Sequence, residues 1–466
     1  MLHVVCGPIW ANNGGNILTR PEQENPLVEG IIWKQLLLYF FPILLGTFFQ
    51  QLYNTADALI VGRTLGANAL GAVGGSTGMI TSTVVGFFMG LTSGAAIIAA
   101  QMMGAKDRNQ VNDSIHTIYG FALAAGILLG ILGVALADKM LLWMKTPQGL
   151  MKDSADYLKI YFAGLIFVLI YNTGASLLRA LGDARRPFVY LVICCVINVV
   201  LDYALIVWFH MGVAGAAVAT VAAQAISAVL VTVRLMHFRQ TCDFSLGRIR
   251  IRPDMLKREL LLGLPGGTQA AMYSISNIIV TAAINGFGEL TVASWTAYSK
   301  FDGLFWMISG AMGVTITTFV GQNFGAGKME RIRKGVRVMN WAYVGIALLM
   351  SAVVIGLRET LFHIFVDSRE AVQIGCRMLL IISPFYLMNI YIENYSGALR
   401  GVGDTLMPML FSVVGICVFR IFYLGLVFPR FPTLEILCAM YPISWLLTNT
   451  LYLVYYPIRM RKLGMR

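Results

Sequence analysis

The sequence contains little charge for its length. Lys, Arg, Asp and Glu make up 12% of its 466 residues, whereas 58% of the residues are hydrophobic and the mean hydropathy is +0.72. A soluble domain carries about 25% charged residues, so this composition could not cover a protein in water. It predicts an integral membrane protein.

The sequence also lacks the short alternating segments of a transmembrane β-barrel. Its hydrophobic residues form long blocks instead, each close to the roughly 20 residues that cross a bilayer. Because backbone groups in hydrocarbon must be satisfied within the segment, these blocks should be helices. We expect an all-α membrane protein with about twelve spans, near 36–61, 70–100, 114–137, 157–181, 187–209, 213–237, 260–286, 291–321, 335–357, 375–400, 405–428 and 436–458.

Clusters of catalytic or metal-binding side chains are missing as well. The seven Cys residues have no metal or disulfide spacing, and the five His residues are scattered near termini and loops. The glycine-rich stretch 71–78 is not followed by the Gly-Lys-Ser/Thr of a nucleotide-binding loop. We therefore expect no enzyme, no resident cofactor and no ATP-driven transport from this chain.

The positive charge that is present lies in the loops. A net charge of +12 could indicate a nucleic-acid partner, but cytoplasmic loops of membrane proteins collect Lys and Arg, and we expect no nucleic acid. Basic residues follow the second, fourth, sixth and eighth spans and end the chain, all on one side. The positive-inside rule predicts that this side is cytoplasmic, with both termini there, in a multi-pass protein of the plasma membrane.

The chain repeats itself at a fixed offset. The run 178–183 (Leu-Arg-Ala-Leu-Gly-Asp) resembles the run 399–404 (Leu-Arg-Gly-Val-Gly-Asp), at an offset of 400 − 179 = 221 positions. The run 101–105 (Gln-Met-Met-Gly-Ala) resembles the run 322–326 (Gln-Asn-Phe-Gly-Ala) at the same offset. Two matches in register indicate an internal duplication.

Pro42 and Pro265 match at nearly the same offset. Because six spans return the chain to its starting side, the two halves should be parallel repeats with a central cavity between two lobes, as is typical of transporters. The first residues show no cleavable signal peptide. We expect a mobile tail at 1–30, an N-terminal lobe at 31–237, a basic cytoplasmic linker at 238–259 and a C-terminal lobe at 260–466.

A polar stripe marks the first span. Gln50, Asn54 and Asp57 follow one another at i, i+4 and i+7, which places them on one helix face. A charge inside the membrane costs a few kcal/mol, and intramembrane carboxylates are functional sites by default. Further polar pairs at helical spacing are Asn198 and Asp202 in the fifth span, Thr220 and Gln224 in the sixth, and Asn172 with Ser176 in the fourth.

These features together resemble the multidrug and toxic compound extrusion (MATE) family over about residues 30–460. The first-span run 42–62, the two Gln-x-x-Gly-Ala turns and the two Leu-Arg-x-x-Gly-Asp turns carry the resemblance. It implies a monomer that exports small, amphipathic, often cationic organic compounds against H⁺ or Na⁺, by rocking of two six-helix lobes in the lipid membrane.

One branch of this family couples ions through its N-terminal lobe, and its pattern is present here. The resemblance implies that Asp57 is the main coupling carboxylate, Asp202 its partner, and Asn198, Thr220 and Asn172 their supporting groups. Two carboxylates in a buried pocket repel each other, so that one proton relieves the repulsion. One Na⁺ held by oxygens of Asp57, Asn198, Asp202 and Thr220 would do the same.

The second lobe departs from the pattern of another branch. The expected Glu of the seventh span is absent, and the expected Asp of the tenth span is Asn389. Glu393 follows one turn later, and we expect it to form a structural pair with Arg420. We assign Gln50, Asn54, Gln224, Asn389 and Glu393 to the substrate cavity.

Three other functions remain open at this point. A lipid-linked oligosaccharide or lipid flippase of the related superfamily would have the same helix count but favours a cationic cavity, whereas the clearest stripe here is acidic. A membrane-embedded enzyme would need clustered catalytic residues. A channel is disfavoured by the two-lobe repeat, which is typical of alternating access.

Overall fold

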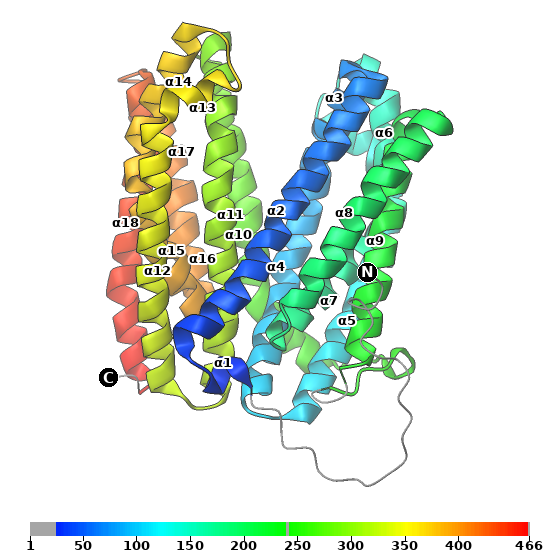
Figure 1. The fold of residues 1–466 in the computed structure, drawn as a ribbon, viewed down its shortest axis with the longest axis vertical. Coiled ribbons are helices and arrows are strands. Elements are labelled where there is room, and N and C mark those ends of the chain that lie inside the picture. The colour runs from blue at the N-terminus through cyan, green and yellow to red at the C-terminus, as the bar shows by residue number, and fades with distance from the viewer. Residues whose placement is uncertain (1–24, 239–241, 465–466) are drawn as a thin grey trace.

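The structure is a computed structural model that describes residues 25–238 and 242–464, and these residues form helices with short connections. Two groups of helices lie close together at one end and diverge toward the other, giving a V shape (Figure 1). The end where they meet, which holds the linker and the turns near Gly104, Gly182, Gly327 and Gly403, is called the closed end below. The opposite end is the open end.

The N-terminal lobe contains eight helices, several of which are fragments of one predicted span. The predicted span 70–100 is broken at Gly75, and the span 157–181 bends by 52° at Gly164. The bounds are α2 (Ile32–Leu65), α3 (Ala67–Gly74), α4 (Ser76–Gly104), α5 (Arg108–Trp143), α6 (Gln148–Ala163), α7 (Leu165–Ala180), α8 (Arg185–Tyr203, continued by a π-helix at Ala204–Trp208) and α9 (Gly212–Met236).

The C-terminal lobe is built in the same order. Its fourth and fifth spans are interrupted, the fourth by a 3₁₀ turn at Ser383–Phe385 and the fifth by a π-helix at Val413–Val418. The bounds are α10 (Pro253–Asn285), α11 (Glu289–Gly325), α12 (Met329–Gly356), α13 (Arg358–His363), α14 (Arg369–Ile382), α15 (Tyr386–Gly401), α16 (Leu406–Ser412), α17 (Phe419–Leu426) and α18 (Leu434–Lys462).

The prediction of a helical membrane protein is confirmed. Each of the predicted spans falls on helical residues, and ten described helices are long and apolar enough to cross a membrane, or eleven if α6 and α7 form one bent span. The predicted number of about twelve spans is slightly higher than this count, because α10 is not apolar enough to be included. The polar and small residues of α10, such as Thr268, Gln269 and Asn277, are the reason.

The lobes have separate hydrophobic cores, and α2 crosses from one to the other. Leu36, Tyr39 and Phe40 at the start of α2 belong to the core of the C-terminal lobe, together with Leu27. Farther along, α2 packs against α8, α3 and α9 of the N-terminal lobe. Figure 1 shows α2 running obliquely from the closed end of one lobe to the open end of the other.

Residues 25–30, the described part of the predicted tail, lie at the start of α2, where α2 contacts the C-terminal lobe. They include α1 (Pro26–Glu29), which contacts α11 and α2. The rest of the tail, residues 1–24, lies outside the described residues.

The repeated Gly-Asp turns have the same structure in both lobes. Gly182 and Gly403 have positive φ angles of 96° and 91°, which glycine adopts without strain. The following Asp side chains tie each turn to the last helix of its lobe. Asp183 forms an ion pair with Arg234 of α9 at 3.5 Å, and Asp404 forms one with Arg459 of α18 at 3.0 Å. In each lobe the glycine of the motif ends a helix, and the aspartate ties that helix end to the last helix of the lobe.

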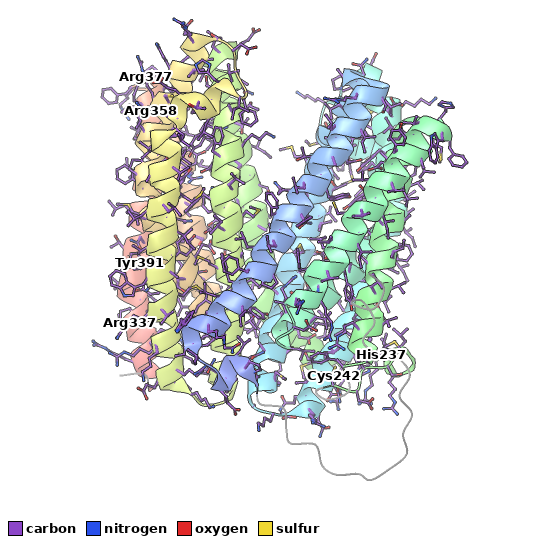
Figure 2. The ribbon with its side chains drawn as sticks, in the orientation of Figure 1. His237, Cys242, Arg337, Arg358, Arg377 and Tyr391 are labelled. Atoms are coloured by element: carbon purple, nitrogen blue, oxygen red, sulfur yellow. The ribbon has the colours of Figure 1, made fainter. Side chains whose placement is uncertain are left out.

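Charged side chains are found at both ends of the molecule. Figure 2 shows His237, Cys242 and Arg337 toward the closed end, whereas Arg358 and Arg377 lie at the open end. The described basic residues of the linker lie at the closed end, where Arg252 forms an ion pair with Asp113 of α5. The linker is shorter than predicted, because α10 already begins at Pro253, a residue well suited to the first helical position.

The lobes touch backbone to backbone where α4 crosses α10. A Cβ atom on Gly94 would lie 2.0 Å from the carbonyl oxygen of Glu259, and one on Gly263 would lie 1.8 Å from that of Leu91. Only glycine fits such distances, and small residues generally allow membrane helices to pack closely. The α4–α10 contact therefore depends on these glycines.

We expect Gly94→Ala to lower the thermal unfolding midpoint of the purified protein, because overpacking costs about 1–3 kcal/mol. Gly86→Ala on the same helix is the control, since a Cβ there has nothing within 4 Å. Alanine stabilises a helix relative to glycine, so the control should unfold at an equal or slightly higher temperature. Equal midpoints for the two variants would contradict the close contact.

Candidate functional site

Two carboxylates face each other in the interior of the N-terminal lobe. Asp57 of α2 is 8% exposed, and Asp202 near the end of α8 is fully buried. Helices α2 and α8 pack side by side, and the two carboxyl groups are close enough to interact. Asn198, one turn before Asp202 on α8, is also fully buried. The structure thus brings together three of the five predicted coupling residues.

These three side chains are poorly satisfied. Among the described residues, Asp57 Oδ1, both carboxylate oxygens of Asp202 and both amide atoms of Asn198 have no hydrogen-bond partner. An unpaired buried polar group costs free energy, and a charged one costs more. A group of such atoms at one place indicates a site that is completed by something else.

Thr220 of α9 is the fourth predicted member of the site, and Tyr53 connects it to α2. The Tyr53 hydroxyl donates to Thr220 Oγ1 at 3.5 Å. Tyr157 of α6 is near enough for the charges of both carboxylates to act on its hydroxyl group. Neither tyrosine was predicted. Tyr53 lies four residues before Asp57 and could have been found from the helical periodicity, whereas nothing in the sequence connects Tyr157 to the site.

The other predicted residues of this lobe lie apart from the carboxylate pair or at its edge. Asn172 of α7 donates back to the carbonyl oxygen of Val168 at 2.8 Å, a local bond within its own helix. Gln224 is buried one turn beyond Thr220, and its Oε1 has no partner among the described residues. Gln50 and Asn54 are exposed on α2.

The predicted pair between Glu393 and Arg420 is wrong. Glu393 lies 3.7 Å from Arg400 on the same helix, α15. The Arg420 guanidinium lies over the ring of Tyr441, 4.1 Å from its centroid. Sequence spacing could not decide between two arginines, because the partner depends on how α15 and α17 are rotated. Asn389, one turn before Glu393, donates to Ser309 Oγ at 3.3 Å.

The C-terminal lobe contains a different kind of carboxylate. Asp302 of α11 accepts from the Tyr386 hydroxyl at 2.8 Å, from Trp306 Nε1 at 2.8 Å and from the Tyr298 hydroxyl at 3.1 Å. Arg420 is close enough to interact with it. Its charge is therefore compensated by three donors and a cation, in contrast to the N-terminal pair.

The N-terminal site suits a proton or Na⁺ better than a multivalent metal. Within residues 25–238 and 242–464, no group of three or more His, Cys, Asp or Glu side chains could hold a metal ion. Two carboxylates with unsatisfied oxygens, a buried amide and a hydroxyl provide hard oxygen ligands of the kind that Na⁺ prefers. The same oxygens could share a proton.

The fold defines the class of this protein: a multi-pass helical membrane protein made of two repeated lobes. Comparison with known proteins then identifies the family. The family model MatE matches residues 42–204 and 265–424, one stretch in each lobe. The chain belongs to the MATE family of multidrug transporters, which is a transporter family and not an enzyme family.

Two relatives come from Bacillus subtilis (strain 168), and both are named probable multidrug resistance proteins. YpnP is 28% identical over 394 residues, covering 84% of this chain and 87% of YpnP. YoeA is 26% identical over 392 residues, covering 83% and 84%. A solved structure of a multidrug resistance MATE transporter in its outward-facing conformation has the same fold, with a TM-score of 0.87 at 21% identity, over 95% of this chain and 99% of that one.

The two kinds of carboxylate should respond oppositely to the same substitution. Asp302→Asn replaces an acceptor that holds three donors, so we expect it to destabilise the protein by about 1–3 kcal/mol. Asp202→Asn replaces a buried carboxyl group whose two oxygens have no partner among the described residues, so it should leave stability unchanged or raise it. The thermal unfolding midpoints of the purified variants at neutral pH measure this difference. A larger decrease for Asp202→Asn than for Asp302→Asn would contradict the assignment.

Proposed function

We propose that this protein exports small organic compounds, chiefly amphipathic cations, in exchange for H⁺ or Na⁺. The Asp57–Asp202 pair binds the coupling ion, with Asn198, Thr220 and Tyr53 around it. The single observation that carries the proposal is the group of buried polar atoms at this pair that lack partners. The names of the curated relatives support the substrate class.

Ion binding would act through α2. The pairing of α10 with α4 is locked by backbone contact at Gly94 and Gly263. The corresponding helices of the other half, α2 and α11, pack against each other less extensively. Pro42 further weakens α2, because proline removes a helical hydrogen bond. An ion at Asp57 would therefore act on a helix that proline weakens and that packs less closely on α11 than α10 does on α4.

Transport would then follow alternating access. The V shape, with the lobes in contact at the closed end, is the outward-facing arrangement if the closed end is cytoplasmic (Figure 1). Ion binding from outside would neutralise the carboxylate pair and favour closing of the open end. Gln50 and Asn54 on α2, Gln224 on α9, and Asn389 and Glu393 on α15 would contact the substrate between the lobes.

The proposed orientation predicts which end reacts from outside the cell. In a variant without native cysteines, we expect Gln148→Cys at the open end to react with a membrane-impermeant maleimide on intact cells. Gly247→Cys in the linker should react only after permeabilisation. Both positions are exposed, so burial does not explain a difference. The reverse labelling pattern would contradict the orientation.

Asp57→Asn should abolish ion-driven export, because the neutral amide cannot exchange a proton and binds Na⁺ more weakly. The measurement uses proteoliposomes loaded with a fluorescent organic cation, with a pH gradient and a Na⁺ gradient imposed separately. We expect one gradient to drive transport in the wild type, and the variant to lose at least about 90% of that rate, which corresponds to a barrier higher by about 1.4 kcal/mol or more.

Asp156→Asn is the matched control, because Asp156 is an exposed carboxylate of the same lobe. It should transport like the wild type. Normal gradient-driven export by Asp57→Asn would contradict the role of the pair. No movement of any organic cation by the wild type would contradict the substrate class, and lipid-linked substrates of the flippase kind would be tested next.

A further inference from the structure

The repeated Gln-x-x-Gly-Ala runs meet each other at the closed end. Gly104 of α4 lies against α11, where a Cβ would be 1.8 Å from the carbonyl oxygen of Gln322. Gly325 of α11 lies against α4 in the same way, 1.8 Å from the carbonyl oxygen of Gln101. Because Gln101 and Gln322 occupy equivalent positions of the repeat, this contact is reciprocal about the axis that relates the lobes.

The side chains of the two glutamines extend the same symmetry. Gln101 Nε2 donates to the carbonyl oxygen of Gly401 at 2.8 Å, and Gln322 Nε2 donates to that of Ala180 at 2.7 Å. Ala180 and Gly401 end α7 and α15 at the two repeated Gly-Asp turns. Each glutamine therefore reaches into the helix end of the opposite lobe.

These carbonyl groups are the ones a helix end leaves unpaired. At the first turn, the amides of Gly182 and Asp183 bond to the carbonyls of Arg179 and Leu178, which leaves the Ala180 carbonyl for a partner from outside. The second turn has the same bonds. Separation of the lobes would leave both carbonyls and both amides without these partners, so the hydrogen bonds favour the closed state.

We propose that Gln101 and Gln322 are positioning residues that form a reciprocal latch, and that the release of this latch opens the closed end during transport. This inference rests on the alternating access proposed above. It adds which contacts must break: two amide-to-carbonyl hydrogen bonds, each between a glutamine of one lobe and a helix end of the other, around a glycine-lined backbone contact.

The segment before α2 connects the latch to the ion site. Asn25 Nδ2 donates to Gln322 Oε1 at 3.1 Å, which fixes the amide so that Nε2 faces the Ala180 carbonyl. Asn323 and Arg331 hold the carbonyl of Leu27 in α1. Because α1 leads directly into α2, a displacement of the helix that carries Asp57 would be transmitted to Gln322.

The test measures the distance between the lobes without substrate or an ion gradient. Spin labels are placed at Asn109→Cys and Glu330→Cys, two exposed positions near the closed end in different lobes, in a variant without native cysteines. The double variant Gln101→Met Gln322→Met keeps the side-chain length and removes both donors. Each lost bond should raise the open-to-closed ratio about 2- to 10-fold, so a longer-distance population should appear in the pulsed dipolar spectrum.

Gln148→Met Gln373→Met is the control, with one exposed glutamine replaced in each lobe. It should keep the short-distance population of the parent. A double latch variant with the same distribution as this control would overturn the proposal. If the double variant does not fold, the single variants Gln101→Met and Gln322→Met carry the same test with smaller shifts. Loss of transport in Asp57→Asn does not affect this result, so the two proposals fail separately.

Discussion

The constraint on which this structure depends is that a polar group inside a membrane protein must find its partner within the protein. Most of the intramembrane polar groups obey it. Asp302 is surrounded by three donors and an arginine, and the helix ends at Ala180 and Gly401 receive the amides of Gln322 and Gln101. Single buried atoms without a partner occur elsewhere among the described residues, but at the Asp57–Asp202 pair such atoms gather on two carboxylates and on neighbouring Asn198.

This contrast distinguishes a structural carboxylate from a functional one more clearly than the position of each charge in the membrane does. A compensated carboxylate stabilises one arrangement of helices and has no reason to bind anything further. An uncompensated pair has its lowest free energy with an ion present, and its cost without one can be used to drive a change of conformation. The helix that carries Asp57 is also the one that crosses from the core of one lobe to the other. Ion binding would therefore change the free energy of the same helix that links the two lobes.

The sequence predicted the helical fold and the two repeats, because hydrophobic length and a repeat offset can be read along the chain. The partnership of Asp57 with Asp202 joins two distant helices, and only the resemblance to a known family implied it. The sequence did not predict the breaks at Gly75 and Gly164, the partner of Glu393 or the participation of Tyr157. Those features depend on how helices distant in sequence are rotated and packed. The Gln-x-x-Gly-Ala run was recognised as a repeat, but its role appeared only when the two copies were seen to meet.

The central claim is that the Asp57–Asp202 pair binds the coupling ion, and ion binding to the purified protein tests it most directly. Radioactive Na⁺ binding and proton uptake on acidification would be measured in detergent, without substrate, for the wild type and for Asp57→Asn Asp202→Asn. The account predicts an ion site in the wild type that is absent from the double variant. Equal binding of both ions by the two proteins would contradict it.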